Sequence, residues 1–174
     1  SFLFIISIPA EVSVGQTITL VMSVTNSGQA QALSVNGVTP TVIGSGSVVL
    51  VSSPASVNLP GSSSSFLTWT YTATGNGTIN FTTRAYGTDE NSGLLIYSNT
   101  ASSQNVIIQT PVQLIGSMVA YPVNVGETNN ITVVMTVSNT GQATALNVSP
   151  SGFTKLGSAS VTLVSGQTPT ASTI

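Results

Sequence analysis

The sequence predicts an all-β protein built from tandem antiparallel β-sandwich domains, of which the second is incomplete. Three observations predict this class. Apolar residues alternate with Ser and Thr along most segments, Gly, Asn and Pro interrupt these segments at short intervals, and one long stretch of sequence occurs twice. No segment shows helical spacing of apolar residues over two turns, so a period of two is the dominant signal.

The duplicated stretch defines the repeat. Residues 18–33 return as residues 131–146, a shift of 113 positions at which 11 of 16 residues are identical. A second block, residues 43–52, returns as residues 156–165 at the same shift. An internal repeat of this length indicates two copies of one structural unit.

The second copy covers only the first half of the unit. Residues 169–174 correspond to residues 54–59 after a slip of two positions, before any counterpart of the segment that carries Trp69. We therefore predict three parts. They are a complete domain at 1–109, a short linker at 110–111 and the first half of a second domain at 112–174.

The chain opens with a short apolar segment, Phe2 to Ile6. It is far shorter than the roughly 18 apolar residues of a membrane span, and it lacks the basic region and cleavage site of a signal peptide. Its counterpart before the second repeat is Val112 to Val119. Both segments are expected to form the first strand of their domain, and we expect no membrane insertion.

The next strand is expected to bury every second residue in both copies. A turn follows in each copy, at Asn26–Gly28 and Asn139–Gly141, where Gly is expected to supply a positive φ and Asn to cap its own turn. The inward rows are Ile18, Leu20, Met22 and Val24 in the first copy, and Ile131, Val133, Met135 and Val137 in the second.

The remaining strands of the first domain follow at short spacing, as in a β-sandwich. Residues 47–52 form a short strand, 66–74 and 78–86 form two long ones, 87–93 form a hairpin loop, and 94–108 close the domain. The predicted core residues of the two long strands are Leu67, Trp69, Tyr71, Ala73, Ile79, Phe81, Thr83 and Ala85.

The chain carries almost no charge. Only six of its 174 residues are charged: Glu11, Arg84, Asp89, Glu90, Glu127 and Lys155. Ordinary domains carry roughly a quarter, so Ser, Thr, Asn and Gln must make the polar surface here. Such a surface offers no electrostatic attraction to nucleic acid or to anionic lipid, and we expect no nucleic-acid partner.

Catalytic and metal-binding residue types are scarce. There is no His and no Cys, so a general base would have to be Glu11, Asp89, Glu90 or Glu127, each without a titratable partner. Asp89, Glu90 and Asn91 could offer oxygens to Ca²⁺, but three adjacent residues cannot supply the six to eight ligands it takes. We expect a solvated hairpin tip there, no enzyme activity, no cofactor and no metal.

Four asparagines stand in glycosylation triplets: Asn76, Asn80, Asn130 and Asn147. With 13 Asn and 52 Ser or Thr in the chain, about four such triplets are expected by chance, so their number is no evidence. Their position says more. Asn80, Asn130 and Asn147 alternate with inward apolar neighbours and are expected to face solvent, where an acceptor must lie.

Several segments together resemble the Ig-like repeats of large prokaryotic surface proteins, the CARDB-type and conserved-repeat domains. They are Val14–Thr19, Val24–Gln29, Phe66–Gly75 and Gly77–Phe81. The resemblance covers one full repeat and the first half of the next. It implies an Ig-like fold and a stalk, spacer or shaft role outside the cell, and it brings no catalytic residues.

The sequence therefore favours a structural repeat of an extracellular fibre, sheath or surface stalk that associates with copies of itself. The alternative is an adhesive or carbohydrate-binding module, which would display aromatic residues instead of burying them. The half domain must be completed either by later strands of a longer chain or by strand addition from a neighbouring subunit. The segment Phe2 to Ile8 is one candidate donor strand.

Overall fold

The computed structural model of the chain describes residues 3–152, 154–164 and 172–174, with residues 3 and 4 described by their backbone alone. Phe2 and residues 169–171, which the sequence predictions include, lie outside these ranges. Contacts divide the chain into two units, Ser1–Thr110 and Pro111–Ile174. Among the described residues all regular elements are strands, which confirms the predicted all-β class.

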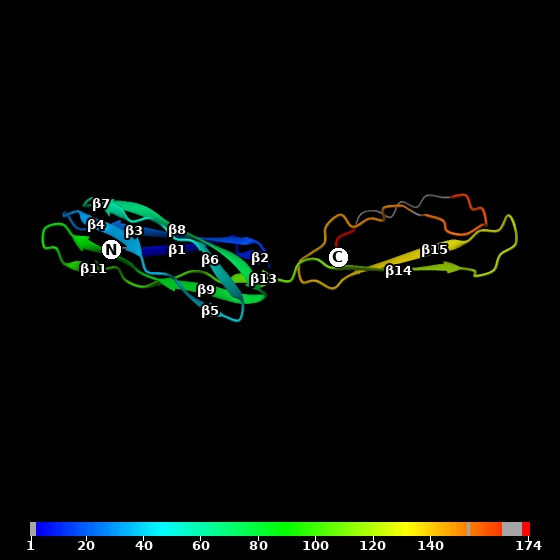
Figure 1. The fold of residues 1–174 in the computed structure, drawn as a ribbon, viewed down its shortest axis with the longest axis horizontal. Coiled ribbons are helices and arrows are strands. Elements are labelled where there is room, and N and C mark those ends of the chain that lie inside the picture. Colours follow the sequence, from blue (N-terminus) through cyan, green and yellow to red (C-terminus); the bar gives the residue numbers. More distant parts are fainter. Residues whose placement is uncertain (1–2, 153, 165–171) are drawn as a thin grey trace. The chain divides into compact units, whose positions relative to one another are not determined.

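The strands of the first unit are short and closely spaced (Figure 1). They are β1 (Leu3–Ile8), β2 (Glu11–Ser13), β3 (Thr17–Asn26), β4 (Ala32–Gly37), β5 (Thr41–Gly44), β6 (Ser47–Ser52), β7 (Val57–Leu59), β8 (Ser63–Gly75), β9 (Gly77–Thr83), β10 (Ala85–Asp89), β11 (Leu95–Tyr97), β12 (Ala101–Ser102) and β13 (Val106–Gln109). The second unit contains β14 (Leu114–Tyr121) and β15 (Thr132–Asn139).

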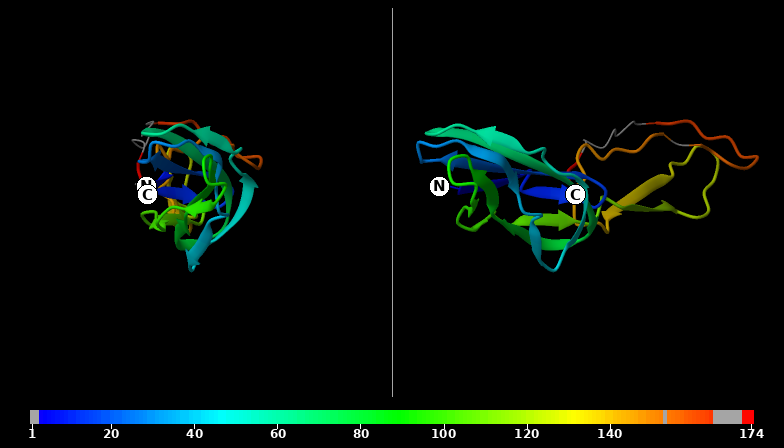
Figure 2. Two further views of the ribbon diagram at one scale, coloured as in Figure 1. Left: turned by 90° about the vertical axis from the view of Figure 1, so that its left-hand side faces the viewer. Right: turned by 60° about the vertical axis from the view of Figure 1, so that its left-hand side comes forward.

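The strands of the first unit form two layers around one core (Figure 2). One layer is the sheet β1-β3-β8-β6. The other contains the sheets β11-β10-β4-β7 and β12-β9-β13-β2, with β5 paired to β9. Pairing is antiparallel except between β13 and β2, which run parallel.

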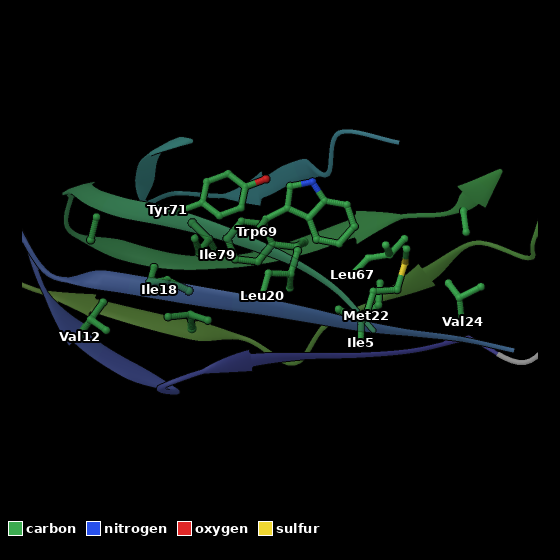
Figure 3. Close-up of a cluster of buried hydrophobic side chains, with 14 of the residues drawn as sticks. Ile5, Val12, Ile18, Leu20, Met22, Val24, Leu67, Trp69, Tyr71 and Ile79 are labelled. Carbon is green, nitrogen blue, oxygen red and sulfur yellow. The ribbon is translucent and has the colours of Figure 1, made fainter. Parts of the chain in front are cut away.

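The core lies where β3 and β8 face the second layer. In their antiparallel register Leu20 lies opposite Trp69 and Met22 opposite Leu67, and directly opposite residues share one face of a sheet. Trp69 is only 1% exposed. The ring of Tyr71 lies 4.7 Å from that of Phe81 in the other layer. All the inward residues predicted for the first domain are buried, which confirms the predicted core (Figure 3).

Two details of the first unit differ from the sequence prediction. The long strand 78–86 is divided at Arg84 into β9 and β10, and β10 continues to Asp89, so the predicted loop 87–93 begins as strand. Gly87 is buried within β10, where an added Cβ would lie 3.0 Å from a methyl of Val35. The glycine there makes room for a neighbouring strand instead of making a turn. Glu11, one of the four acidic candidates for a general base, begins β2.

Candidate functional site

The second unit repeats the pairing geometry of the first. In β14 and β15, Met118 lies opposite Met135, just as Ile5 lies opposite Met22 in β1 and β3. The same shift of 113 residues relates every pair of the β1–β3 ladder to a pair of the β14–β15 ladder. The two copies therefore begin their sheets in the same register, and β1 is already paired within its own unit.

The turn after this strand is built identically in both units. Asn26 Nδ2 donates to the carbonyl of Ala30 at 2.8 Å, and its Oδ1 accepts from the amide of Gly28 at 3.0 Å. Asn139 makes the two corresponding bonds, also at 2.8 and 3.0 Å. The predicted Asn cap is confirmed. The predicted positive φ is wrong, because neither Gly28 nor Gly141 has one.

Unusual backbone conformations recur at the same shift. Ser34 and Asn147 have φ values of 52° and 55°, although both are L residues with a side chain. Gly15 and Thr128 have φ values of 93° and 70°. Non-glycine residues adopt such values seldom, so their recurrence shows that the repeat extends to the backbone path.

The two units differ in what covers the inward row. In the first unit the row is buried, whereas in the second Ile131, Val133 and Met135 are 42%, 44% and 47% exposed and Val137 is half-buried. We call these four residues the open face. The outer edge of β15, which corresponds to the edge of β3 that holds β8, pairs with no strand in the described part of the chain. The inward row of β15, expected to be buried, is therefore exposed, which makes β15 a candidate strand acceptor.

The candidate glycosylation residues are not equally accessible. Asn76, in the turn between β8 and β9, is exposed, as are Asn130 and Asn147. Asn80 is half-buried, and its Oδ1 is buried with no hydrogen-bond partner in the structure. Asn80 alternates with buried Ile79 and Phe81 as expected, but it is only partly exposed, because β5 pairs with β9 and places Ile43 opposite it. Glycosylation itself stays a prediction.

The acidic hairpin tip is organised by its own hydrogen bonds. Asp89 Oδ1 accepts bonds from the amide and hydroxyl of Ser92 at 2.8 and 2.9 Å and from the amide of Asn91 at 3.1 Å. The bonds from Ser92, followed by that from Asn91, hold the pKa of Asp89 below its usual range. In the described ranges no group of three acidic, His or Cys side chains is placed to hold a metal ion.

An exposed aromatic and basic cluster was not found from the sequence. The guanidinium of Arg84 lies 4.2 Å from the ring centroid of Tyr97, and the rings of Tyr86 and Tyr97 are 6.4 Å apart. Tyr97 is 53% exposed and ends the apolar run Leu94–Tyr97, all of it exposed. The run does not alternate apolar with polar residues, and this departure from the β pattern could have marked the cluster in the sequence.

Comparisons with known proteins leave the family open. No family model and no curated protein matches the chain. A crystal structure of BcpA, the major pilin subunit of Bacillus cereus, is similar over 66% of this chain and 42% of that chain, with 10% identity and a TM-score of 0.34. This chain thus spans less than half of that pilin. So distant a likeness does not establish a shared fold or function.

The described residues contain no candidate membrane-spanning helix. None of them forms a helix that is both long enough and apolar enough to cross a bilayer.

Proposed function

We propose that this chain is a structural repeat of an extracellular fibre, sheath or surface stalk, joined to its neighbours by strand pairing. The observation that carries the proposal is the open face of β15. Its strand register repeats that of β3, yet the strand and the second layer that cover β3 have no counterpart on it among the described residues.

The energetics favour covering this face. Each large apolar side chain left unburied forgoes about 1.5–3 kcal/mol, and an unpaired strand edge recruits other strands. A strand with the alternation of β8 fits β15 for the same reason that β8 fits β3. In the first unit, Ile18, Leu20 and Met22 on β3 lie opposite Tyr71, Trp69 and Leu67 on β8. The corresponding positions on β15 are held by Ile131, Val133 and Met135. A later part of a longer chain or a neighbouring copy supplies that strand.

The surface chemistry supports a structural role without catalysis. Hydroxyl side chains bond to one another across neighbouring strands on the outer faces. The pairs are Thr25 with Ser64 at 2.8 Å, Ser52 with Thr70 at 2.5 Å and Thr82 with Ser102 at 2.8 Å. These groups do not titrate, so a surface made of them keeps its charge and its hydrogen bonds over a wide pH range. Such a surface suits a protein exposed to the exterior.

The alternative function, an adhesive or carbohydrate-binding module, has one observation in its favour. Tyr97 is exposed beside Arg84 and Tyr86, as an aromatic platform for a sugar would be. The single Trp argues the other way, since Trp69 is buried in the core with Tyr71 and Phe81. Phe66 and Tyr121 are exposed but are not part of the cluster at Tyr97. The structural role therefore explains more of the molecule.

Adjacent residues of β15 provide a matched test. Met135 belongs to the open face, whereas Val134 points to the opposite face of the same strand and is similarly exposed. We expect the chain to associate with rising concentration in sedimentation velocity, and Met135→Asp to weaken that association by removing the contribution of the open face. Val134→Asp should associate like the parent. Equal effects of the two substitutions, or association unaffected by Met135→Asp, would contradict the proposal.

A further inference from the structure

The β10–β11 hairpin leaves an apolar strand at the edge of its sheet. β11 is the last strand in the order β11-β10-β4-β7, and its outer side pairs with no strand among the described residues. Leu94, Leu95, Ile96 and Tyr97 are all exposed. Natural edge strands are usually short or carry a charge, a proline or a bulge that prevents pairing with another chain. β11 is three residues long but carries no charge, proline or bulge.

The hydrogen bonds of this hairpin show which backbone groups of β11 are unpaired. The amide of Ser98 donates to the carbonyl of Ala85, and the amide of Asp89 donates to the carbonyl of Leu94, both at 2.9 Å. Hydrogen-bonded and non-bonded pairs alternate along an antiparallel ladder. The amide and carbonyl groups of Leu95 and Tyr97 therefore point away from β10, towards the open edge.

Two other edge strands of the first unit, β6 and β1, are modified in ways that β11 is not. β6 also carries exposed Val49 and Val51, but two irregularities interrupt its register with β8. Such bulges twist an edge away from pairing. On β1, the carbonyl of Ser7 accepts a bond of 2.8 Å from Gln104 Nε2. By contrast, β11 keeps a regular register with β10 over its whole length.

The charges near this edge are arranged so that a second copy complements the first. Arg84 precedes Ala85, whose carbonyl accepts a bond from the amide of Ser98, the residue that follows β11. Asp89 and Glu90 lie at the other end of the hairpin, before β11 begins. When two such edges run antiparallel, the acidic end of one lies beside the basic end of the other. Arg84 is the only Arg of the chain, and these two acids are half of its carboxylate side chains.

We propose that β11 pairs antiparallel with β11 of a second copy of this chain, around a two-fold axis at Ile96. Leu95 of each copy then exchanges both backbone hydrogen bonds with Tyr97 of the other, and the two Ile96 side chains meet. A two-fold contact of this kind uses the same patch twice and closes. The inference rests on the proposed function for the idea that copies associate, but it uses a different strand from the open face.

A single cysteine tests the geometry, because the chain has none of its own. Facing residues of a non-bonded antiparallel pair have Cα atoms about 4.5 Å apart, within the span of a disulfide. Ile96→Cys, made together with Met135→Asp to block the open face, should give a disulfide-linked dimer as the main product of mild oxidation. Val51→Cys on the β6 edge, in the same background, is the matched control and should stay largely monomeric.

A second substitution tests the backbone bonds. Leu95→Pro removes an amide that points outward, so the ladder to β10 loses no bond. In sedimentation velocity it should weaken dimerisation roughly tenfold or more, because two hydrogen bonds are lost across the two-fold axis. A circular dichroism spectrum and melting temperature like those of the parent show that the variant folds.

Equal cross-linking of Ile96→Cys and Val51→Cys would overturn the inference, as would an unchanged dimer in Leu95→Pro. Neither result bears on the open face, which the comparison of Met135→Asp with Val134→Asp tests separately. A sugar that binds at Tyr97 while the chain stays monomeric would also overturn it, and would favour the carbohydrate-binding alternative.

Discussion

Asn139 Nδ2 donates a hydrogen bond of 3.2 Å to the carbonyl oxygen of Ile174. Asn26 makes the same bond to Leu59 in the first unit, at 3.1 Å. The amide of Ala145 also donates to the carbonyl of Ile174, at 2.7 Å, which reproduces the pairing of Ala32 with Leu59. The hydrogen bonds that join the region of Asn26 and Ala32 to Leu59 in the first unit therefore recur in the second unit, with Ile174 in place of Leu59. Ile174 is two residues further along than the shift of 113 alone would place it, as inferred from the sequence alignment.

Because Asn26 bonds to Leu59 as well as to its own turn, we expect its side chain to stabilise the first unit beyond that turn. Asn26→Ala removes donors from the carbonyls of Ala30 and Leu59 and the acceptor of Gly28. At about 1 kcal/mol for each bond, the free energy of unfolding should fall by roughly 2–3 kcal/mol in urea denaturation. The control is Asn99→Ala at an exposed position, which should change it by less than about 0.5 kcal/mol.

The core of the first unit should depend strongly on Trp69. Trp69→Ala leaves a large cavity between the two layers, and such substitutions cost about 3–5 kcal/mol. Phe66 lies three residues earlier on the same strand but is exposed, so Phe66→Ala should change the free energy of unfolding by no more than about 0.5 kcal/mol. Similar losses for the two variants would mean that β8 does not face the core in this way.

Stability should respond weakly to acid. The lowered pKa of Asp89 means that its contribution is present above the unfolded value of about 3.9 and is lost as the pH falls through the folded value. Asp89 is still partly exposed to solvent, which keeps that contribution small. Melting temperatures from about pH 2 to pH 8 should therefore differ by only a few degrees. A steep acid transition would show a titrating group that this account omits.

Alkaline pH should act through Tyr71. Burial raises the pKa of Tyr71 to about 12, above the unfolded value of about 10. Because the folded pKa is the higher one, stability is fully present below about pH 10 and is lost as the pH rises from 10 towards 12. Tyr71→Phe should reduce that loss in thermal melts, and Tyr121→Phe, at an exposed position, should not.

The burial of Tyr71 has a second consequence at neutral pH. Its hydroxyl is buried without a hydrogen-bond partner in the structure, and an unsatisfied buried polar group is destabilising. Tyr71→Phe should therefore leave the melting temperature at pH 7 unchanged or raise it.

Glycan occupancy should follow accessibility. In a host that glycosylates secreted proteins, Asn76, Asn130 and Asn147 should carry glycans and Asn80 should not, because the Asn80 side chain is partly covered. Mass spectrometry of glycopeptides reads each position separately. Occupancy at Asn80 equal to that at Asn76 would mean that modification precedes the pairing of β5 with β9.

The sequence predicted what depends on alternation and repetition. The inward rows of β3, β8 and β9 follow from a period of two, and the position of the corresponding row on β15 follows from the duplicated stretch. The partial burial of Asn80 could not be predicted, because it depends on which distant strand pairs with β9. The parallel pairing of β13 with β2 and the exposed edge at β11 are likewise set by contacts between segments far apart in the sequence.

The most direct test of the central claim is amide hydrogen exchange along β15, compared with β3. In a dilute monomeric chain, β15 amides that point away from β14 should exchange quickly, whereas the corresponding amides of β3, bound to β8, should be protected. Adding a synthetic peptide of residues 63–83, which carries β8 and β9, should protect the β15 amides. The account is contradicted if those amides are already as protected as their β3 counterparts in the monomer, or stay unprotected with the peptide at saturation.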